Sequence, residues 1–216
     1  MFRGFDKDAI AFLHELTIEM NRDWFEANKD RYKRVWVEPL TELLEEVGKK
    51  LAKAYAPVKL TPHVFRIYRD TRFSRDKAPY KTHVAGVLRA GPVGSGMYFH
   101  VETGEEWVGA GRYYFEGDEL LRWRKKIAAD KTGKEIAGIV ARLRKQGYEV
   151  GGHDDYKRVP RPYPADHPRA EFLRMKGLTA AFPAMPRGML HRAELVDWIV
   201  KHSKAVAPMV KWLRKL

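Results

Sequence analysis

The sequence predicts an α+β protein, with a mostly antiparallel central sheet packed by N-terminal and C-terminal helices. Two segments, 5–56 and 118–216, carry apolar residues at helical spacing. Between them, residues 62–115 contain short apolar runs separated by turn residues, which is the pattern of strands. Because short turns join antiparallel neighbours, whereas parallel strands need long crossovers, we expect an antiparallel sheet.

We expect residues 1–216 to form a single domain. A chain of this length can bury a sizeable core as one unit. Several prolines lie between Gly151 and Pro168, and they predict a long loop. We interpret this loop as part of the same domain, because the segment after it has too few elements for a core of its own.

Three helices are predicted near the N-terminus. Asp6 is a suitable N-cap for the first helix, and Asn21 for the second. Pro39 is expected to end the second helix and begin a third, which Pro57 closes. The faces that these helices would bury are Ile10, Leu13, Leu16 and Met20; Trp24, Phe25, Asn28, Tyr32, Val35 and Trp36; and Leu40, Leu43, Leu44, Val47 and Leu51.

Strands are predicted in the middle of the chain, at 63–68, 84–88, 97–101 and 106–111. Gly94, Ser95 and Gly96 have the turn chemistry of a hairpin before the third of these strands. Residues 148–150 are a candidate for a further strand. These segments are the expected central sheet.

Helices are predicted again after residue 118, and the last of them has the most regular pattern. Pro208 is expected to bend its axis. The apolar positions are Leu120, Trp123 and Ile127; Ile136, Ile139, Val140 and Leu143; and Leu195, Ile199, His202, Val206, Met209 and Leu213. Lysines occupy the opposite face of the last helix: Lys201, Lys204, Lys211 and Lys215.

Composition excludes several classes of protein. Hydrophobic residues make up 44% of the chain, which argues against disorder. The absence of cysteine excludes disulfides, thiol catalysis and cysteine-based zinc sites. No apolar run approaches the roughly 20 residues of a membrane span, and residues 1–6 lack the plan of a signal peptide. We therefore expect a soluble, cytoplasmic protein with no membrane partner.

The net charge of +13 is concentrated in the C-terminal half. Residues 1–119 are balanced, whereas residues 120–216 hold 22 basic and 9 acidic side chains. A basic half can attract nucleic acid through its long-range field. The solvated faces of amphipathic helices produce the same composition without any partner. Nucleic-acid binding through the basic C-terminal half is therefore one alternative function.

The densest group of charged side chains lies between residues 65 and 81. Its cations are Arg66, Arg69, Arg72, Arg75, Lys77 and Lys81, and its acids are Asp70 and Asp76. The stretch from Ser74 to Pro79 has loop chemistry, so a loop beside a strand end would present the later cations. Each acid can orient one arginine through a bidentate pair, which leaves positive charge for a phosphate or carboxylate.

The same residues are compatible with a purely structural role. Arginines and aspartates can form a network that ties the loop to the helices, with the function lying in contacts with partner proteins. In that structural role Tyr68, Phe73 and Tyr80 would belong to the core, whereas in a ligand site they could stack on a base, sugar or peptide group. The residues alone leave these interpretations open.

Residues 66–82, with the sequence RIYRDTRFSRDKAPYKT, resemble the signature of the domain of unknown function 2461 family. Residues 21–25, 109–111 and 166–168 support the resemblance, which runs over nearly the whole chain. Two positions depart from the family pattern. Arg22 stands where a second asparagine is usual, and Tyr114-Phe115 stands where a proline often follows the glycine turn. The resemblance implies a one-domain organisation, leaves the reaction open and favours a functional role for the charged motif.

The preferred hypothesis is a polar cleft for an anionic, phosphate-bearing ligand, in a binding protein or an enzyme. Asp70 and Asp76 are expected to orient the cations or to act as acid and base. Asn21 and Trp24 are further candidate contacts. The residues expected to bind the anion or line the rim are Arg66, Arg69, Arg72, Lys77, Tyr80 and Lys81.

The sequence indicates no particular cofactor and no metal site. His63, His83 and His100 lie in or next to predicted strands without a recognised ligand spacing, so isolated structural or surface histidines are favoured. Ser74 lacks the sharp turn and the base of a catalytic nucleophile. The glycine-rich segments match no phosphate-binding pattern and are expected to be turns.

Overall fold

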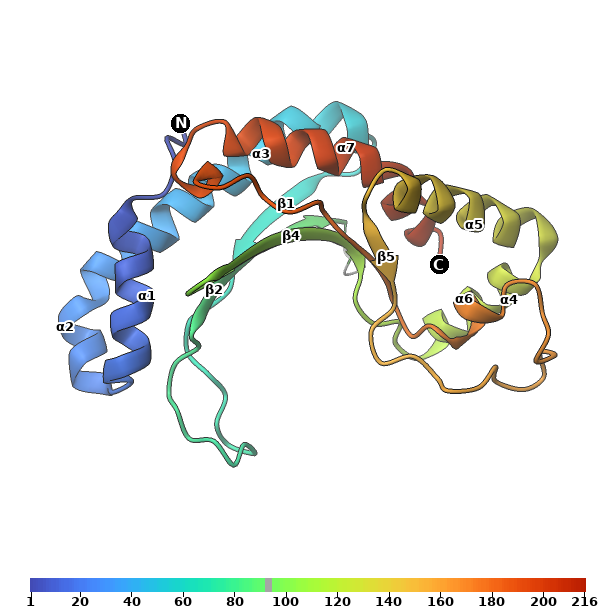
Figure 1. Ribbon diagram of the computed structural model, residues 1–216, viewed down its shortest axis with the longest axis horizontal. Coiled ribbons are helices and arrows are strands. Elements are labelled where there is room, and N and C mark those ends of the chain that lie inside the picture. The colour runs from blue at the N-terminus through green and yellow to red at the C-terminus, as the bar shows by residue number, and fades with distance from the viewer. Residues whose placement is uncertain (92–94) are drawn as a thin grey trace.

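The computed structural model describes residues 1–91 and 95–216, and within these residues a six-stranded antiparallel sheet lies between two groups of helices (Figure 1). The predicted α+β class is confirmed. Gly94, part of the predicted hairpin turn, lies outside the described residues. The strands are β1 (Leu60–Val64), β2 (His83–Ala90), β3 (Gly96–Glu102), β4 (Glu105–Arg112), β5 (Glu149–Gly151) and β6 (Leu178–Ala181), in the spatial order β1-β2-β3-β4-β6-β5.

The N-terminal helices begin where the caps predict. The Asp6 carboxylate accepts a hydrogen bond from the N–H of Asp8 at 2.8 Å, and the Asn21 side chain accepts one from the N–H of Trp24 at 2.9 Å. The helices are α1 (Lys7–Glu19), α2 (Arg22–Tyr32) and α3 (Glu38–Tyr55), with a π-helical segment η1 (Lys33–Val37) between the last two.

The predicted break at Pro39 is wrong, because the chain passes from α2 to α3 without leaving the helix. In η1 the N–H of Glu38 donates to the carbonyl of Lys33, five residues earlier. Pro39 then falls in the first turn of α3. A proline in that position costs little, since its missing N–H would have no intrahelical partner there.

Helices α3 and α7 (Leu195–Leu213) pack against one face of the sheet. At Gly86 of β2 the backbone approaches α3 so closely that a Cβ atom would stand 2.8 Å from Leu44 Cδ1. The six predicted apolar positions of α7 are all buried, and the lysines opposite are exposed. No helix in the described part of the chain is both long enough and apolar enough to span a membrane.

The C-terminal helices are α4 (Asp118–Ala128), α5 (Asp130–Lys145) and α6 (Ala170–Arg174), and a 3₁₀ turn, η2 (Met189–His191), precedes α7. Trp123 of α4 is buried, and its Nε1 donates to the carbonyl of Phe172 at 2.9 Å. The long loop before α6 ends at the buried Arg169, whose Nε donates to the carbonyl of Ile127 at 2.7 Å. This hydrogen bond fixes the end of the loop to α4.

Strand β6 is an element that the sequence did not predict. It lies between β4 and β5, although β5 comes earlier in the chain. Gly111 makes the pairing with β4 possible: its φ is +145°, and a Cβ atom there would stand 2.3 Å from the carbonyl oxygen of Leu178. A strand of four residues is too short for its alternation to distinguish it from a loop.

The sheet face that α3 and α7 leave uncovered is called here the open face. In Figure 1 it is the concave underside of the arch, between the N-terminal helices and the C-terminal helices. The register of the strands defines its members, because directly paired residues point to the same side. On β1 to β4 they include His63, His83, Val87, Tyr98, His100, Glu102 and Trp107.

Candidate functional site

The charged motif, called here the arginine loop (residues 65–82), is a hairpin that continues β1 and β2 beyond the sheet (Figure 1). The N–H of Lys81 donates to the carbonyl of Ile67 at 2.8 Å, and the N–H of Arg69 donates to that of Pro79 at 2.9 Å. The base of the loop is therefore a paired stem, and its tip is irregular.

Both acids of the arginine loop pair with arginines of the same loop. Asp70 accepts hydrogen bonds from Arg72 Nε at 3.0 Å and Nη2 at 2.7 Å, and Asp76 accepts one from Arg69. The Arg72 guanidinium holds the pKa of Asp70 below its ordinary value. The pKa of Asp76 is lowered mainly by the hydrogen bond from the N–H of Ala78, and next by the hydrogen bond from Arg69. Ionised carboxylates of this kind orient arginines.

The two lysines of the loop donate to backbone carbonyls. Lys77 Nζ lies 2.9 Å from the carbonyl oxygen of Thr71 at the tip, and Lys81 Nζ lies 2.9 Å from that of Arg66 at the base. Lys81 is half-buried, and its Nζ stands 5.9 Å from the centroid of the Phe65 ring. The cations of the loop are therefore divided between the tip and the base.

Tyr80 was expected at the rim of a cleft, but it lies in the core. Its side chain is 2% exposed, and its ring stacks on Phe25 of α2 at a centroid distance of 4.4 Å. Asn21 and Trp24 likewise serve α2: the first caps the helix, and the ring of the second packs on Phe12 at 5.5 Å. The stem of the loop turns Tyr80 toward α2, which the sequence pattern does not reveal.

A second group of side chains, called here the His-His-Glu cluster, lies on the open face and consists of His83, His100 and Glu102. His83 on β2 is directly opposite Glu102 on β3, and the rings of His83 and His100 are 4.6 Å apart. One donor atom from each side chain lies within 4.8 Å of the other two. The expectation of isolated histidines is therefore wrong for His83 and His100.

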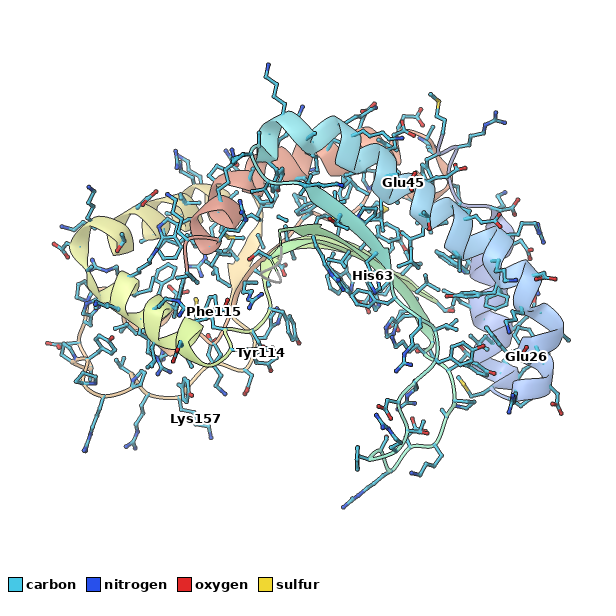
Figure 2. All side chains as sticks on the ribbon, turned by 180° about the vertical axis from the view of Figure 1, so that it is seen from behind. Glu26, Glu45, His63, Tyr114, Phe115 and Lys157 are labelled. Atoms are coloured by element: carbon cyan, nitrogen blue, oxygen red, sulfur yellow. The ribbon has the colours of Figure 1, made fainter. Side chains whose placement is uncertain are left out.

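Aromatic rings surround this cluster. Trp107 of β4 stacks on His100 at 5.1 Å, with the ring planes 17° apart, and contacts Tyr98 at 5.2 Å. Phe65, at the base of the arginine loop, lies 6.0 Å from Tyr98. Figure 2 shows His63 on the same side of the sheet, beneath the arch. A ring-lined surface thus begins where the arginine loop joins the sheet.

Burial and neighbouring positive charge lower the pKa of basic groups where the arginine loop joins the sheet. Burial is the largest cause that lowers the pKa of Lys81, and the Arg66 guanidinium adds to it. Burial also lowers the pKa of His83 and of His100, and both His100 and Lys81 contribute at His83. The Glu102 carboxylate acts in the opposite direction on both histidines. Positive charge is therefore crowded at the base of the loop.

Part of the cluster has a signal in the sequence. Alternation along 97–102 predicts that Tyr98, His100 and Glu102 share one face of a strand, since Met97, Phe99 and Val101 fill the other. His83 joins them only through the register between β2 and β3. No pattern within either strand specifies that register.

The basic face of the last helix is separate from this site. Lys201, Lys204 and Lys211 are exposed on α7, which packs on the sheet face opposite the open face. These lysines and the ring-lined surface therefore do not form one continuous surface.

Comparison with known proteins gives one result on the identity of the chain. The comparison with curated proteins and the comparison with solved structures gave no match. One family model, described as conserved hypothetical protein (DUF2461), matches residues 8–212, which is nearly the whole length and includes the arginine loop. The chain therefore belongs to the DUF2461 family.

Proposed function

We propose that the protein binds a small phosphate-bearing molecule with a flat ring, such as a nucleotide, on the open face beside the base of the arginine loop. The position of Lys81 is the observation that carries this proposal. Its ammonium lies 5.9 Å from the centre of the Phe65 ring, and Phe65 begins the ring-lined surface. A cation for the phosphate therefore adjoins a surface for the ring.

Positive charge at the base of the loop supports this proposal. The acids of the loop are engaged by Arg69 and Arg72. Among the described residues, Arg66 and Lys81 form no ion pair with a carboxylate. A phosphate can accept hydrogen bonds from both and neutralise them, and in this proposal Asp70 hydrogen-bonds Arg72 instead of transferring protons.

The aromatic side chains support a ligand with a flat ring. Trp107 is 37% exposed although it is a strand residue, and Tyr98 beside it is half-buried. Stacking of a base on such a ring contributes about 1–3 kcal/mol in proteins that bind single-stranded nucleic acids. A nucleotide would therefore gain from stacking as well as from its phosphate.

A small molecule is favoured over a polymer. Extended binding of nucleic acid requires basic side chains that follow the backbone along one groove. Lys201, Lys204 and Lys211, the basic face that the sequence offers for such binding, lie on α7, on the other side of the sheet from the rings. Nucleic-acid binding through the C-terminal half therefore remains a separate candidate, which the same experiment tests.

The test is ligand-dependent thermal stabilisation of protein kept metal-free with a chelator. Adenosine monophosphate is expected to raise the melting temperature more than inorganic phosphate does, because only the nucleotide can stack. A ligand at 100 times its Kd stabilises the folded state by about 2.7 kcal/mol, which a melting curve resolves. Lys81→Met and Trp107→Ala are expected to abolish the shift while the folded state persists.

The matched control is Lys211→Met, which removes one exposed lysine from α7. It is expected to keep the nucleotide response. The proposal is overturned if neither ligand shifts the melting temperature, or if Lys81→Met responds like the wild type. Binding of a single-stranded oligonucleotide that is lost in Lys211→Met and kept in Lys81→Met would establish the C-terminal alternative instead.

A further inference from the structure

We propose that His83, His100 and Glu102 bind a divalent transition-metal ion on the open face. Each side chain offers one donor atom, and these three atoms lie within 4.8 Å of one another. Two imidazole nitrogens and one carboxylate oxygen are a ligand set that zinc and iron(II) use where coordination positions stay open. Hard cations such as magnesium prefer oxygen ligands alone.

The sheet holds the backbones of the three ligands in a suitable arrangement. His83 and Glu102 are direct partners across β2 and β3, and His100 precedes Glu102 by two residues on the same face. Metal–ligand bonds of about 2.0–2.2 Å require donor atoms roughly 3–3.5 Å apart. Donor atoms that stand farther apart than this, within the 4.8 Å limit, must approach one another by side-chain rotation. In the described part of the chain, no side-chain hydrogen bond holds His83 or Glu102 away from such a rotation.

Tyr98 favours the correct form of one ligand. Its hydroxyl lies 3.5 Å from His100 Nδ1. An Nδ1–H that donates to this oxygen leaves the lone pair on Nε2 available for a metal. Metal-binding histidines usually have a partner of this kind on the other nitrogen, and the stacked ring of Trp107 limits the orientation of His100 further.

Charge on the open face also supports a cation. Glu102 is paired directly with Glu105 across β3 and β4, and like charges in that position are destabilising. Among the described residues, neither carboxylate forms an ion pair. A divalent ion bound by Glu102 would neutralise this carboxylate and relieve its repulsion with Glu105.

A metal in the cluster would add a second contact to the ligand of the proposed function. An ion with three protein ligands keeps at least one position for water or for an oxygen of a bound molecule. A phosphate oxygen held by Lys81 would be near such a position. This last step rests on the proposed function, whereas the metal site itself does not.

The test is isothermal titration calorimetry, in which Zn²⁺ is added to tag-free protein that a chelator has stripped of metal. We expect one ion per chain. His83→Gln, His100→Gln and Glu102→Gln are each expected to weaken binding by at least about tenfold. Co²⁺ provides an independent readout, because visible absorption bands should develop in the wild type and be lost in the three variants.

The matched control is His63→Gln, since His63 is an exposed histidine on the same face but outside the cluster. It is expected to bind Zn²⁺ like the wild type. The inference is overturned if the wild type binds no stoichiometric zinc, or if cluster variants that melt like the wild type retain full affinity. Nucleotide binding by metal-free protein that takes up no zinc would leave the proposed function intact and overturn only the metal site.

Discussion

The ring of Tyr80 stacks on the ring of Phe25, with centroids 4.4 Å and planes 27° apart. Tyr80 belongs to the arginine loop and Phe25 to α2, so this contact joins the base of the loop to the N-terminal helices. Tyr68 adds an edge contact to Phe25 at 5.5 Å. Phe73 at the tip is 96% exposed. The loop is therefore anchored at its base and solvated at its tip.

Tyr80→Ala is expected to destabilise the protein by about 3 kcal/mol, because it leaves a cavity against Phe25. Tyr68→Ala is the control from the same stem, and it should cost less than half as much, since Tyr68 is 39% exposed. Urea unfolding followed by circular dichroism measures both. Equal losses for the two variants would contradict an anchoring role for Tyr80.

Two glycines of α5 are expected to respond oppositely to alanine. At Gly133 a Cβ atom would stand 2.2 Å from the carbonyl oxygen of Ile127, so Gly133→Ala should destabilise by about 1–3 kcal/mol. Gly138 has open space around it, and Gly138→Ala should stabilise by up to about 1 kcal/mol through helix propensity. Thermal melting of both variants gives the comparison. A rise in melting temperature for Gly133→Ala would refute the close packing.

His202 is expected to make the protein less stable in mild acid. Burial, and then the charge of Lys201, lowers the pKa of His202 below the ordinary 6.5. At a pH between the lowered pKa of the folded protein and the ordinary value of 6.5, His202 is protonated in the unfolded chain but not in the folded protein. The stability therefore falls as the pH decreases below 6.5. Within the core, the side chain of His202 contacts the hydroxyl of Tyr148, which lies 2.7 Å from His202 Nδ1.

The measurement is the free energy of unfolding in urea at pH values of about 7.5 and 5.5. The wild type should lose more stability over this interval than His202→Gln, which cannot be protonated. The other histidines are present in both proteins, so their contributions cancel. An identical loss in the two proteins would show that His202 is not responsible.

Arg31 is expected to stabilise the contact between α1 and α2. Its guanidinium donates to Asp8 at 2.5 Å and to Glu15 at 2.6 Å, and these hydrogen bonds lower the pKa of both carboxyls. Arg31→Gln should cost about 1–2 kcal/mol at neutral pH, since the three side chains are only partly exposed.

The same ion pairs predict how the variant responds to acid. A lowered carboxyl pKa contributes stability above the ordinary values of 3.8 and 4.5, and this contribution is lost as the pH falls through the folded-state pKa. The difference in unfolding free energy between wild type and Arg31→Gln should therefore shrink below a pH of about 4. A difference that stays constant down to a pH of about 2 would contradict the ion pairs.

Much of the fold could be predicted because its signals are local. The stripe from Leu195 to Leu213 repeats at helical spacing, and all of its members are buried. The caps Asp6 and Asn21 act through hydrogen bonds two or three residues away. The prediction of a break at Pro39 was wrong, because proline is compatible with the first turn of a helix. The π-helical segment η1 carries the chain into α3 so that Pro39 falls in that first turn.

The site was less predictable because it depends on contacts between distant segments. The charged composition of the arginine loop could be read directly, but the burial of Tyr80 depends on α2, which lies far earlier in the chain. The proximity of His83 and His100 depends on the register of β2 and β3. Shifting that register by one residue would place His83 on the core side, and the sequence of either strand alone does not specify it.

The position of β6 has a consequence for how the protein is made. In the described residues β5 pairs with β6 alone, so β5 has no strand to join until residues 178–181 have docked beside β4. Strands β1 to β4 can assemble from neighbouring hairpins while the chain is still being synthesised. The other edge of the sheet must wait until most of the chain has left the ribosome. We therefore expect β5 to join the sheet late in folding.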